Sequence, residues 1–277
     1  MGVIVVFCPK CGEEVEASWN FCPSCKHNLD GMGEKRDIKA VETEKTEDKS
    51  SAFYEESHAV VIGVNEYKKV RSLNSSVADA EAVEEVLLNF GFPEENITKL
   101  VNEQATRQNI QDTLKVEMRE RCGEEDRLLV YFAGHGQDYE LSEDERVGYL
   151  LPVDADPDYL PSRGISMEEV KKWNRHIPAK HILYVIDSCY SGLAATRSTG
   201  LPPDRDDYLK EIGRRKVRQI ITAGSGDEKA LEKGGHGVFT RTFLRAIKGD
   251  ADLHGKGVIT GFDLGNYLNL NSESKLA

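Results

Sequence analysis

From about residue 56 onward, the sequence alternates short apolar runs with segments of helical periodicity. The apolar runs cover residues 58–63, 97–101, 127–132, 181–186 and 219–222, of which 97–101 is the weakest, and residues 149–151 are a further candidate for a short strand. Continuous apolar runs of this length are typical of strands buried on both faces, and helices between them provide the crossovers of a parallel sheet. The pattern therefore predicts an α/β fold, a mostly parallel sheet with helices on both faces.

Helix signals occupy the intervals between these runs. One helix is expected from Ser76 to Phe90, and a second begins at Thr106, which is a suitable N-cap residue. A capping box over residues 166–169 begins a third, short helix, and residues 238–247 form a fourth. Binding sites in such sheets lie just beyond the carboxyl ends of the strands, so the residues that follow each apolar run are the first candidates for function.

Four of the six cysteines stand close to the N-terminus as two C-x-x-C pairs. They are Cys8, Cys11, Cys22 and Cys25. Two such pairs bring four thiolates within reach of one tetrahedral zinc ion, and in a unit this small the metal would supply much of the folding free energy. The unit resembles the small zinc-ribbon modules at the N-termini of many prokaryotic proteins, which implies structural Zn²⁺. The alternative is two disulfides or redox-active pairs.

Composition divides the chain into three parts. Residues 1–29 form the zinc ribbon, residues 30–55 a flexible charged linker, and residues 56–277 the α/β domain. No apolar stretch approaches the about 20 residues of a membrane span, and no export signal is recognised. We therefore expect no membrane interaction and a cytoplasmic location, where unpaired thiols stay reduced.

Charge argues against a nucleic-acid partner. The formal net charge is −12, and a field of that sign repels phosphate backbones. The zinc ribbon has no basic face either, because its acidic residues outnumber its lysines. We expect the ribbon to regulate the α/β domain or to recruit a regulatory protein.

Two polar motifs follow two of the apolar runs. The segment A-G-H-G after residues 127–132 contains His135, and D-S-C-Y-S-G after residues 181–186 contains Cys189. A free thiol is mostly protonated at neutral pH, so a nucleophilic cysteine needs a base beside it. An imidazole can take the thiol proton and later protonate the leaving amine. The backbone N–H groups of Gly136 and Cys189 are candidates for binding the oxyanion.

In this order the two motifs resemble the caspase-hemoglobinase fold, closest to bacterial and archaeal caspase-like peptidases and metacaspases. The resemblance covers about residues 56–265. Four further segments match the family: residues 59–67, 76–80, 222–227 and 235–240. The resemblance implies a cysteine-type endopeptidase that acts on protein or peptide substrates, with a Cys189/His135 dyad.

Simpler structural roles stand beside these assignments. Cys189 could be an inert buried thiol and His135 a turn residue, although their positions at strand ends favour catalysis. Cys122 has no such setting and is expected to be structural. His236 lies in a second G-H-G motif, to which the family gives no catalytic role, so a structural role is expected for it.

The resemblance also suggests a specificity. In metacaspases, acidic residues line the pocket and cleavage follows Arg or Lys, and Asp79 and Asp187 match two of them. Ala133 stands where many metacaspases have serine. Caspases hold a substrate Asp with arginines, but Leu73 stands at one such position, so that specificity would depend on nearby Arg71. The structural alternatives are a helix-dipole charge for Asp79 and a turn role for Asp187.

Regulation is implied by the family as well. Calcium often activates these enzymes through an acidic loop, which makes Ca²⁺ a candidate activator here. The acidic candidates are Glu168 and Glu169, or Asp138, Glu140, Asp144 and Glu145. The polar stretch between Ser191 and Val217 matches the inter-subunit linker, so self-cleavage after Arg or Lys is expected there. Two alternatives remain open, a catalytically silent scaffold whose zinc ribbon recruits partners and a peptide ligase of the same fold.

Overall fold

The computed structural model describes residues 6–7, 14–15, 53–142, 145–188, 213–223, 232–233, 236–252 and 257–271. The chain divides into two compact units, Met1–Glu47 and Asp48–Ala277. In the first unit, β1 (Val6–Phe7) pairs antiparallel with β2 (Glu14–Val15), and the first C-x-x-C pair lies in the sequence between them. The four predicted zinc ligands themselves lie outside the described residues.

The second unit is built on a five-stranded sheet with the order β10-β9-β5-β3-β4. Its strands are β3 (Ser57–Gly63), β4 (Ile97–Val101), β5 (Arg127–Ala133), β9 (His181–Asp187) and β10 (Val217–Thr222). Every neighbouring pair is parallel. The five predicted strands and the parallel sheet are therefore confirmed.

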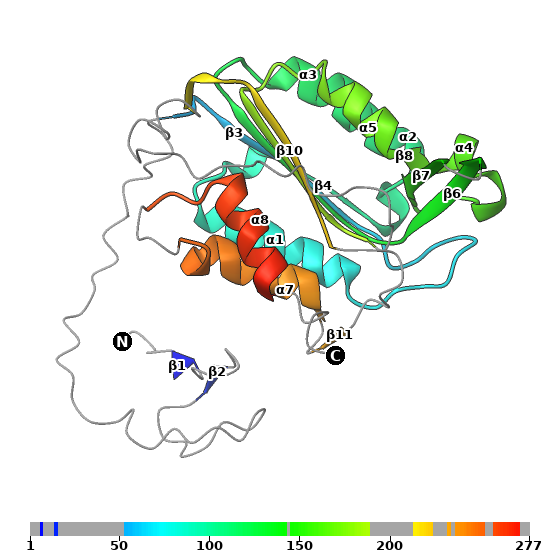
Figure 1. Ribbon diagram of the computed structural model, residues 1–277, viewed down its shortest axis with the longest axis horizontal. Helices are drawn as coiled ribbons and strands as arrows, with labels where there is room; N and C mark the ends of the chain where they lie inside the picture. The colour runs from blue at the N-terminus through cyan, green and yellow to red at the C-terminus, as the bar shows by residue number, and fades with distance from the viewer. Residues whose placement is uncertain are drawn as a thin grey trace. The chain divides into compact units, whose positions relative to one another are not determined.

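Helices cover both faces of this sheet (Figure 1). On one face lie α1 (Ser76–Asn89), α7 (Val238–Arg245) and α8 (Gly261–Asn271). On the other face lie α2 (Arg107–Asp112), α3 (Met118–Arg121) and α5 (Met167–Asn174). One π-helical turn, Thr113–Glu117, joins α2 to α3, and another, Ala246–Asp250, follows α7.

Two layers of core form because alternate strand residues face opposite sides of the sheet. Val60 and Phe132 pack toward α2 and α5, whereas Val61 and Tyr131 pack toward α1 and α7. Most residues of the central strands β3, β5 and β9 are buried, which explains why the middle of each of these strands is apolar.

The predicted helix caps are present. The Thr106 hydroxyl accepts a hydrogen bond from the Asn109 N–H, and Ser166 and Glu169 form a reciprocal capping box at the start of α5. The helix expected over residues 238–247 is present as α7, and its π-helical extension ends around Gly249, whose φ of 129° few other residues adopt.

A β-hairpin beyond the end of β5 was not predicted in full. The sequence suggested only a short strand at residues 149–151, but β6 (Gly136–Ser142) pairs with β7 (Glu145–Leu150), which also pairs with β8 (Ile165–Ser166). β6 is mostly exposed and polar, so it gives no apolar signal. The remaining short elements are α4 (Leu160–Arg163), β11 (Glu232–Lys233), β12 (His236–Gly237) and the 3₁₀ turns Glu94–Asn96, Asn102–Gln104 and Pro157–Tyr159.

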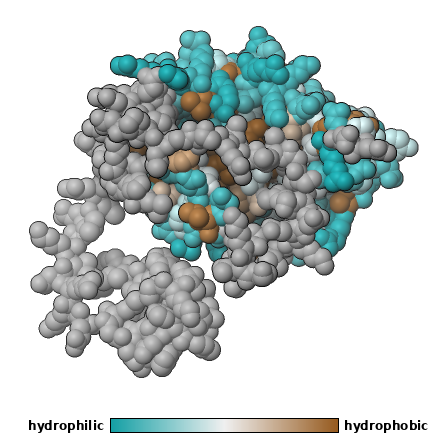
Figure 2. Space-filling view, in the orientation of Figure 1, coloured by the Kyte–Doolittle hydropathy of each residue, from teal (hydrophilic) through white to brown (hydrophobic). Residues whose placement is uncertain are grey.

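The coloured part of the surface in Figure 2 is largely hydrophilic, and apolar side chains appear on it as separate patches. Within the described ranges, the helices are too short or too polar to cross a bilayer.

Candidate active site

The candidate catalytic residues belong to neighbouring strands. In the register of β5 and β9, Ala133 is paired with Asp187, and the Gly134 N–H donates to the Asp187 carbonyl (3.1 Å). His135 lies two residues beyond Ala133 in the chain, and Cys189 lies two residues beyond Asp187. The described part of the second segment ends at Ser188, so Cys189 itself lies outside it.

His135 is held by contacts to its backbone and to its ring. Its backbone N–H donates to the Tyr67 hydroxyl (2.7 Å), and the two rings are inclined with centroids 5.0 Å apart. The ring Nε2 lies 2.8 Å from the Arg71 carbonyl oxygen. Because a carbonyl can only accept, Nε2 carries the proton and Nδ1 is left as the basic nitrogen of the neutral ring.

The half-buried position of His135 keeps its ring neutral. Burial lowers the pKa of the imidazole, and the positive charge of Arg71 lowers it further, against the Arg71 carbonyl hydrogen bond, which raises it. A histidine with a lowered pKa is unprotonated near pH 7, the state in which it can accept a proton.

Both glycines of the A-G-H-G motif have identifiable roles. A Cβ on Gly134 would lie 2.6 Å from the Tyr67 hydroxyl oxygen, so only glycine leaves room for the tyrosine that holds His135. The Leu151 N–H donates to the His135 carbonyl oxygen (3.0 Å). The next pair of residues along the two strands is Gly136 and Leu150. Hydrogen-bonded and non-bonded positions alternate in an antiparallel pair, so the N–H of Gly136 points away from β7.

The structure brings the two predicted pocket carboxylates together. Asp79 lies in the first turn of α1 with its side chain only 2% exposed, and Asp187 ends β9. Both approach Gly237, where an added Cβ would lie 3.0 Å from Asp187 Oδ2 and 3.2 Å from Asp79 Oδ2. A side chain at position 237 would therefore collide with both acids.

Each carboxylate has its own donors. Asp79 Oδ1 lies 2.7 Å from His236 Nδ1, and the Gly237 N–H lies 3.1 Å from Asp79 Oδ2. Thr240 donates its hydroxyl to Asp187 Oδ2 (2.5 Å) and also contacts the hydroxyl of fully buried Tyr131.

Burial nevertheless dominates the titration of both acids. It raises the pKa of Asp79 despite the hydrogen bonds from Gly237 and His236. It raises the pKa of Asp187 to about 6, with the negative charge of Asp79 adding to the shift and the Thr240 hydrogen bonds opposing it. A positive charge brought between the two carboxylates would lower both values.

Several contacts of this site were not expected from the sequence. The Arg71 carbonyl is a backbone atom, and no sequence signal identifies it. Tyr67 and Thr240 lie in segments that match the family, but nothing in their residue types indicated their partners. His236, expected to be structural, contacts a pocket carboxylate. Arg71, considered for binding a substrate Asp, is exposed and contributes its carbonyl to His135.

Two of the predicted calcium ligands, Glu169 and Glu140, are engaged with neighbouring side chains. Glu169 bonds to the Ser166 hydroxyl and pairs with Arg107. Glu140 on β6 pairs with Arg146 on β7, and Asp144 lies outside the described residues. Calcium binding stays a prediction.

Within the described ranges, one group of three potential metal ligands has its ligand atoms within 4.8 Å of one another. The group lies at the amino ends of β3 and β5. His58 Nε2 is 3.2 Å from Asp126 Oδ2 and 3.5 Å from Glu56 Oε2. The other nitrogen of His58 is buried without a hydrogen-bond partner, whereas metal-bound histidines usually donate it to an acceptor. The arrangement fits a histidine that donates from Nε2 to Asp126.

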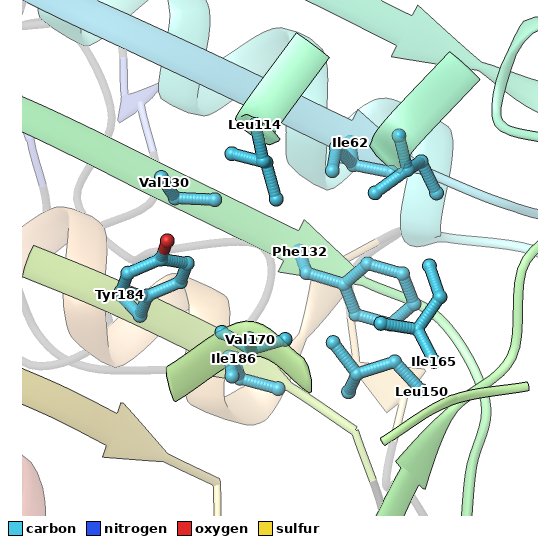
Figure 3. Close-up of a pocket in the computed structure, with 10 residues that line it drawn as sticks. Ile62, Leu114, Val130, Phe132, Leu150, Ile165, Val170, Tyr184 and Ile186 are labelled. Atoms are coloured by element: carbon cyan, nitrogen blue, oxygen red, sulfur yellow. The ribbon is translucent and has the colours of Figure 1, made fainter. Parts of the chain in front are cut away.

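A small cavity lies in the core on the α2 and α5 side of the sheet (Figure 3). Its volume is about 20 Å³, enough for one water molecule. Its walls are apolar except for the Tyr184 hydroxyl, which has no hydrogen-bond partner. The cavity has neither the size nor the charge to bind a peptide side chain.

Comparison with known proteins agrees with this arrangement. The caspase-domain model matches residues 56–259, and a zinc-ribbon model matches residues 7–25. Because the first match spans well over half of the chain, the protein belongs to the caspase-domain family, and it carries an N-terminal zinc ribbon. The donor set of Cys8, Cys11, Cys22 and Cys25 and the β1–β2 pairing around the first C-x-x-C pair fit structural zinc.

Two curated relatives are fungal metacaspases. Metacaspase-1 of Candida albicans is 26% identical over 214 residues, which are 69% of this chain and 46% of that protein. Metacaspase-1 of Lodderomyces elongisporus is 24% identical over 198 residues, which are 64% of this chain and 43% of that protein. The chain thus spans less than half of the length of these relatives.

Solved structures with the same fold include two proteins of low identity. A protein from Geobacter sulfurreducens gives a TM-score of 0.53 at 18% identity and covers 77% of this chain and 88% of its own. Caspase-1 from Spodoptera frugiperda gives 0.52 at 14% identity and covers 78% of this chain and 75% of its own. At such identities the likeness concerns the fold alone.

Proposed function

We propose that the protein is a cysteine-type endopeptidase in which Cys189 is the nucleophile and His135 is the general base. The observation that carries this proposal is the pairing of β5 with β9. Ala133 is paired with Asp187, and the two catalytic residues follow at the same offset on adjacent parallel strands. This favours a nucleophile and a base on one rim of the sheet, where α/β folds place their sites.

The protonation of His135 suits the reaction. With its Nε2–H directed to the Arg71 carbonyl, the free Nδ1 takes the proton from the Cys189 thiol. The thiolate attacks the peptide carbonyl, and the imidazolium then gives its proton to the leaving amine as the C–N bond breaks. A water molecule, deprotonated by the same nitrogen, hydrolyses the thioester and returns the thiol. The Arg71 carbonyl favours the imidazolium while it exists.

Gly136 is proposed to contribute to oxyanion binding. Its N–H points away from β7 by the alternation of the hairpin, and it has no side chain to obstruct the substrate carbonyl. The backbone N–H of Cys189 is the second proposed donor. Two preorganised donors are the usual requirement for a tetrahedral oxyanion.

Cleavage after Arg or Lys is proposed from the chemistry of the acid pair. Asp79 and Asp187 both approach Gly237, and burial raises the pKa of each carboxyl. A guanidinium or ammonium placed at this position would stabilise both ionised carboxylates, whereas a substrate Asp would be repelled.

Three finer proposals follow from the sequence. The zinc ribbon regulates the peptidase or recruits a protein partner, calcium activates it, and the chain cleaves itself between Ser191 and Val217. Arg214, near the end of that stretch, is exposed, as a cleavage site must be. A fragment that appears in the wild type on incubation, but not in a Cys189→Ala variant, would support self-cleavage.

The test is cleavage of fluorogenic peptides that end in Arg, Lys or Asp, by wild type and by Cys189→Ala, with and without calcium. Turnover of the Arg and Lys peptides by the wild type alone is the expected result. Turnover of the Asp peptide instead would retain the peptidase and refute the basic specificity. Turnover of none of them under any condition would refute the peptidase and leave the scaffold.

A further inference from the structure

The carboxylate of Asp79 is already paired with a side chain of the same protein. His236 Nδ1 lies 2.7 Å from Asp79 Oδ1, although the two residues are 157 positions apart. The Asp79 side chain is 2% exposed, whereas that of His236 is 36% exposed. The imidazole therefore lies between a buried carboxylate and the surface.

The segment that contains His236 approaches both pocket acids. The Gly237 N–H contacts Asp79, its α-carbon lies beside both carboxylates, and Thr240 donates its hydroxyl to Asp187. Among the described residues, Asp187 is engaged by the neutral hydroxyl and backbone N–H of Thr240, while Asp79 is engaged by a group that can carry positive charge. His236 thus occupies Asp79 as the end of a cationic substrate side chain would.

We propose that His236 is a specificity-determining residue that occupies Asp79 in place of the substrate cation and must leave it before an arginine or lysine side chain can bind. The proposal rests on the proposed basic specificity and adds to it an internal competitor. A neutral side chain gains too little from the carboxylates to displace His236 and binds without entering between them, whereas a strong cation displaces His236 at the cost of one exchangeable contact.

The exchange is physically feasible because the two partners differ. The imidazole is 36% exposed, so water can replace Asp79 as its partner and the imidazole can move away without unfolding the segment. A guanidinium offers several donors in a planar fork and could engage both carboxylates, whereas the imidazole engages one. The Gly237 N–H would keep part of Asp79 satisfied during the exchange.

The proposal is tested by binding in the full-length, zinc-loaded Cys189→Ala chain, so that no turnover is needed. Fluorescence anisotropy would measure the Kd of two labelled peptides that differ only in arginine or its neutral isostere citrulline. Adding His236→Ala or His236→Gln should tighten the arginine peptide by roughly two- to fivefold, the range for loss of a partly exposed competing contact. The citrulline peptide should change by less than about twofold.

His176→Gln is the matched control, because His176 is an exposed histidine whose backbone N–H bonds to Trp173. It should leave both peptides unchanged. Gln at position 236 keeps a hydrogen-bond donor, so a change seen in both variants cannot be caused by loosening of the segment in the Ala variant. Weaker or unchanged binding of the arginine peptide in both His236 variants would overturn the proposal. His236 would then be a residue that holds Asp79 in position.

Kinetics in the Cys189-containing chain give a second readout. If His236 competes with substrate, its replacement lowers KM for the arginine peptide and leaves kcat unchanged; if it positions Asp79, KM rises. An arginine peptide that binds to none of the chains would also refute the internal competitor. The peptidase itself is judged separately, by Cys189-dependent turnover of any of the peptides in the panel described above.

Discussion

Replacing Asp187 by asparagine should stabilise the caspase domain at pH 8 and have little effect on its stability at pH 4. Burial and the charge of Asp79 raise the pKa of the Asp187 carboxyl to about 6, whereas an unfolded aspartate titrates near 3.9. Between these values the native state binds more protons than the unfolded state. Stability therefore falls as the pH rises through this window.

The size of the effect follows from the shift. About two pKa units at 1.36 kcal/mol each correspond to roughly 3 kcal/mol of lost stability above pH 6, and to less than about 1 kcal/mol at pH 4. Asparagine removes the charge but keeps an oxygen that can accept the Thr240 hydroxyl proton. For a domain of this size the gain at pH 8 corresponds to a midpoint about 5–10 °C higher.

Thermal unfolding would be followed by circular dichroism in a Cys189→Ala background at pH 4 and pH 8. Asp112→Asn is the control, because Asp112 is exposed on α2 and its carboxylate accepts hydrogen bonds from Gln108, which the oxygen of asparagine can also accept. It should shift neither midpoint by more than about 1 °C. A stability change for Asp187→Asn that is equal at both pH values, or a loss at pH 8, would refute the reasoning.

Three other outcomes are expected. Tyr67→Phe removes the acceptor of the His135 N–H, which should lower kcat by about five- to tenfold and leave KM nearly unchanged, as steady-state kinetics would measure. Cys11→Ser should reduce bound zinc to well below one ion per chain, as elemental analysis would measure. A chelator should unfold the ribbon and leave the melting temperature of the caspase domain unchanged. The ratio of kcat/KM for peptides ending in Arg to that for peptides ending in citrulline should rise as the pH increases through about 6, because Asp187 becomes ionised, whereas the titration of His135 affects both peptides alike; a ratio that stays constant through that pH would contradict the assignment.

Much of the fold could be predicted because its strands are buried on both faces. The central strands are apolar along most of their length, and all five strands of the sheet were recognised, whereas the exposed strand β6 was not. Because most residues of β6 are polar and exposed, the strand has no hydrophobic pattern. The hairpin also reverses at a point where the sequence has no glycine-containing tight turn to mark it.

The candidate site was predictable only where a motif marks it. His135 follows a strand whose register with β9 is now known, so its place at the carboxyl edge was correctly anticipated. The contacts that tune the site join distant residues: His236 lies 157 positions from Asp79, and Thr240 lies 53 positions from Asp187. Such pairings depend on how α7 packs beside α1 and β9, which one sequence does not reveal.

The titration of the carboxylates distinguishes Asp156 from the two acids beside Gly237. Asp156 pairs with Lys69, and that contact lowers the pKa of its carboxyl. Asp79 and Asp187 have donors as well, yet their pKa values are raised, because the donors at hand do not offset their burial and proximity. A fold gains no stability from two such groups. The presence of both acids beside Gly237 is explained if a cation from outside the protein completes the charge balance. Among the described residues, His236 is the side chain that partly takes the place of such a cation at Asp79.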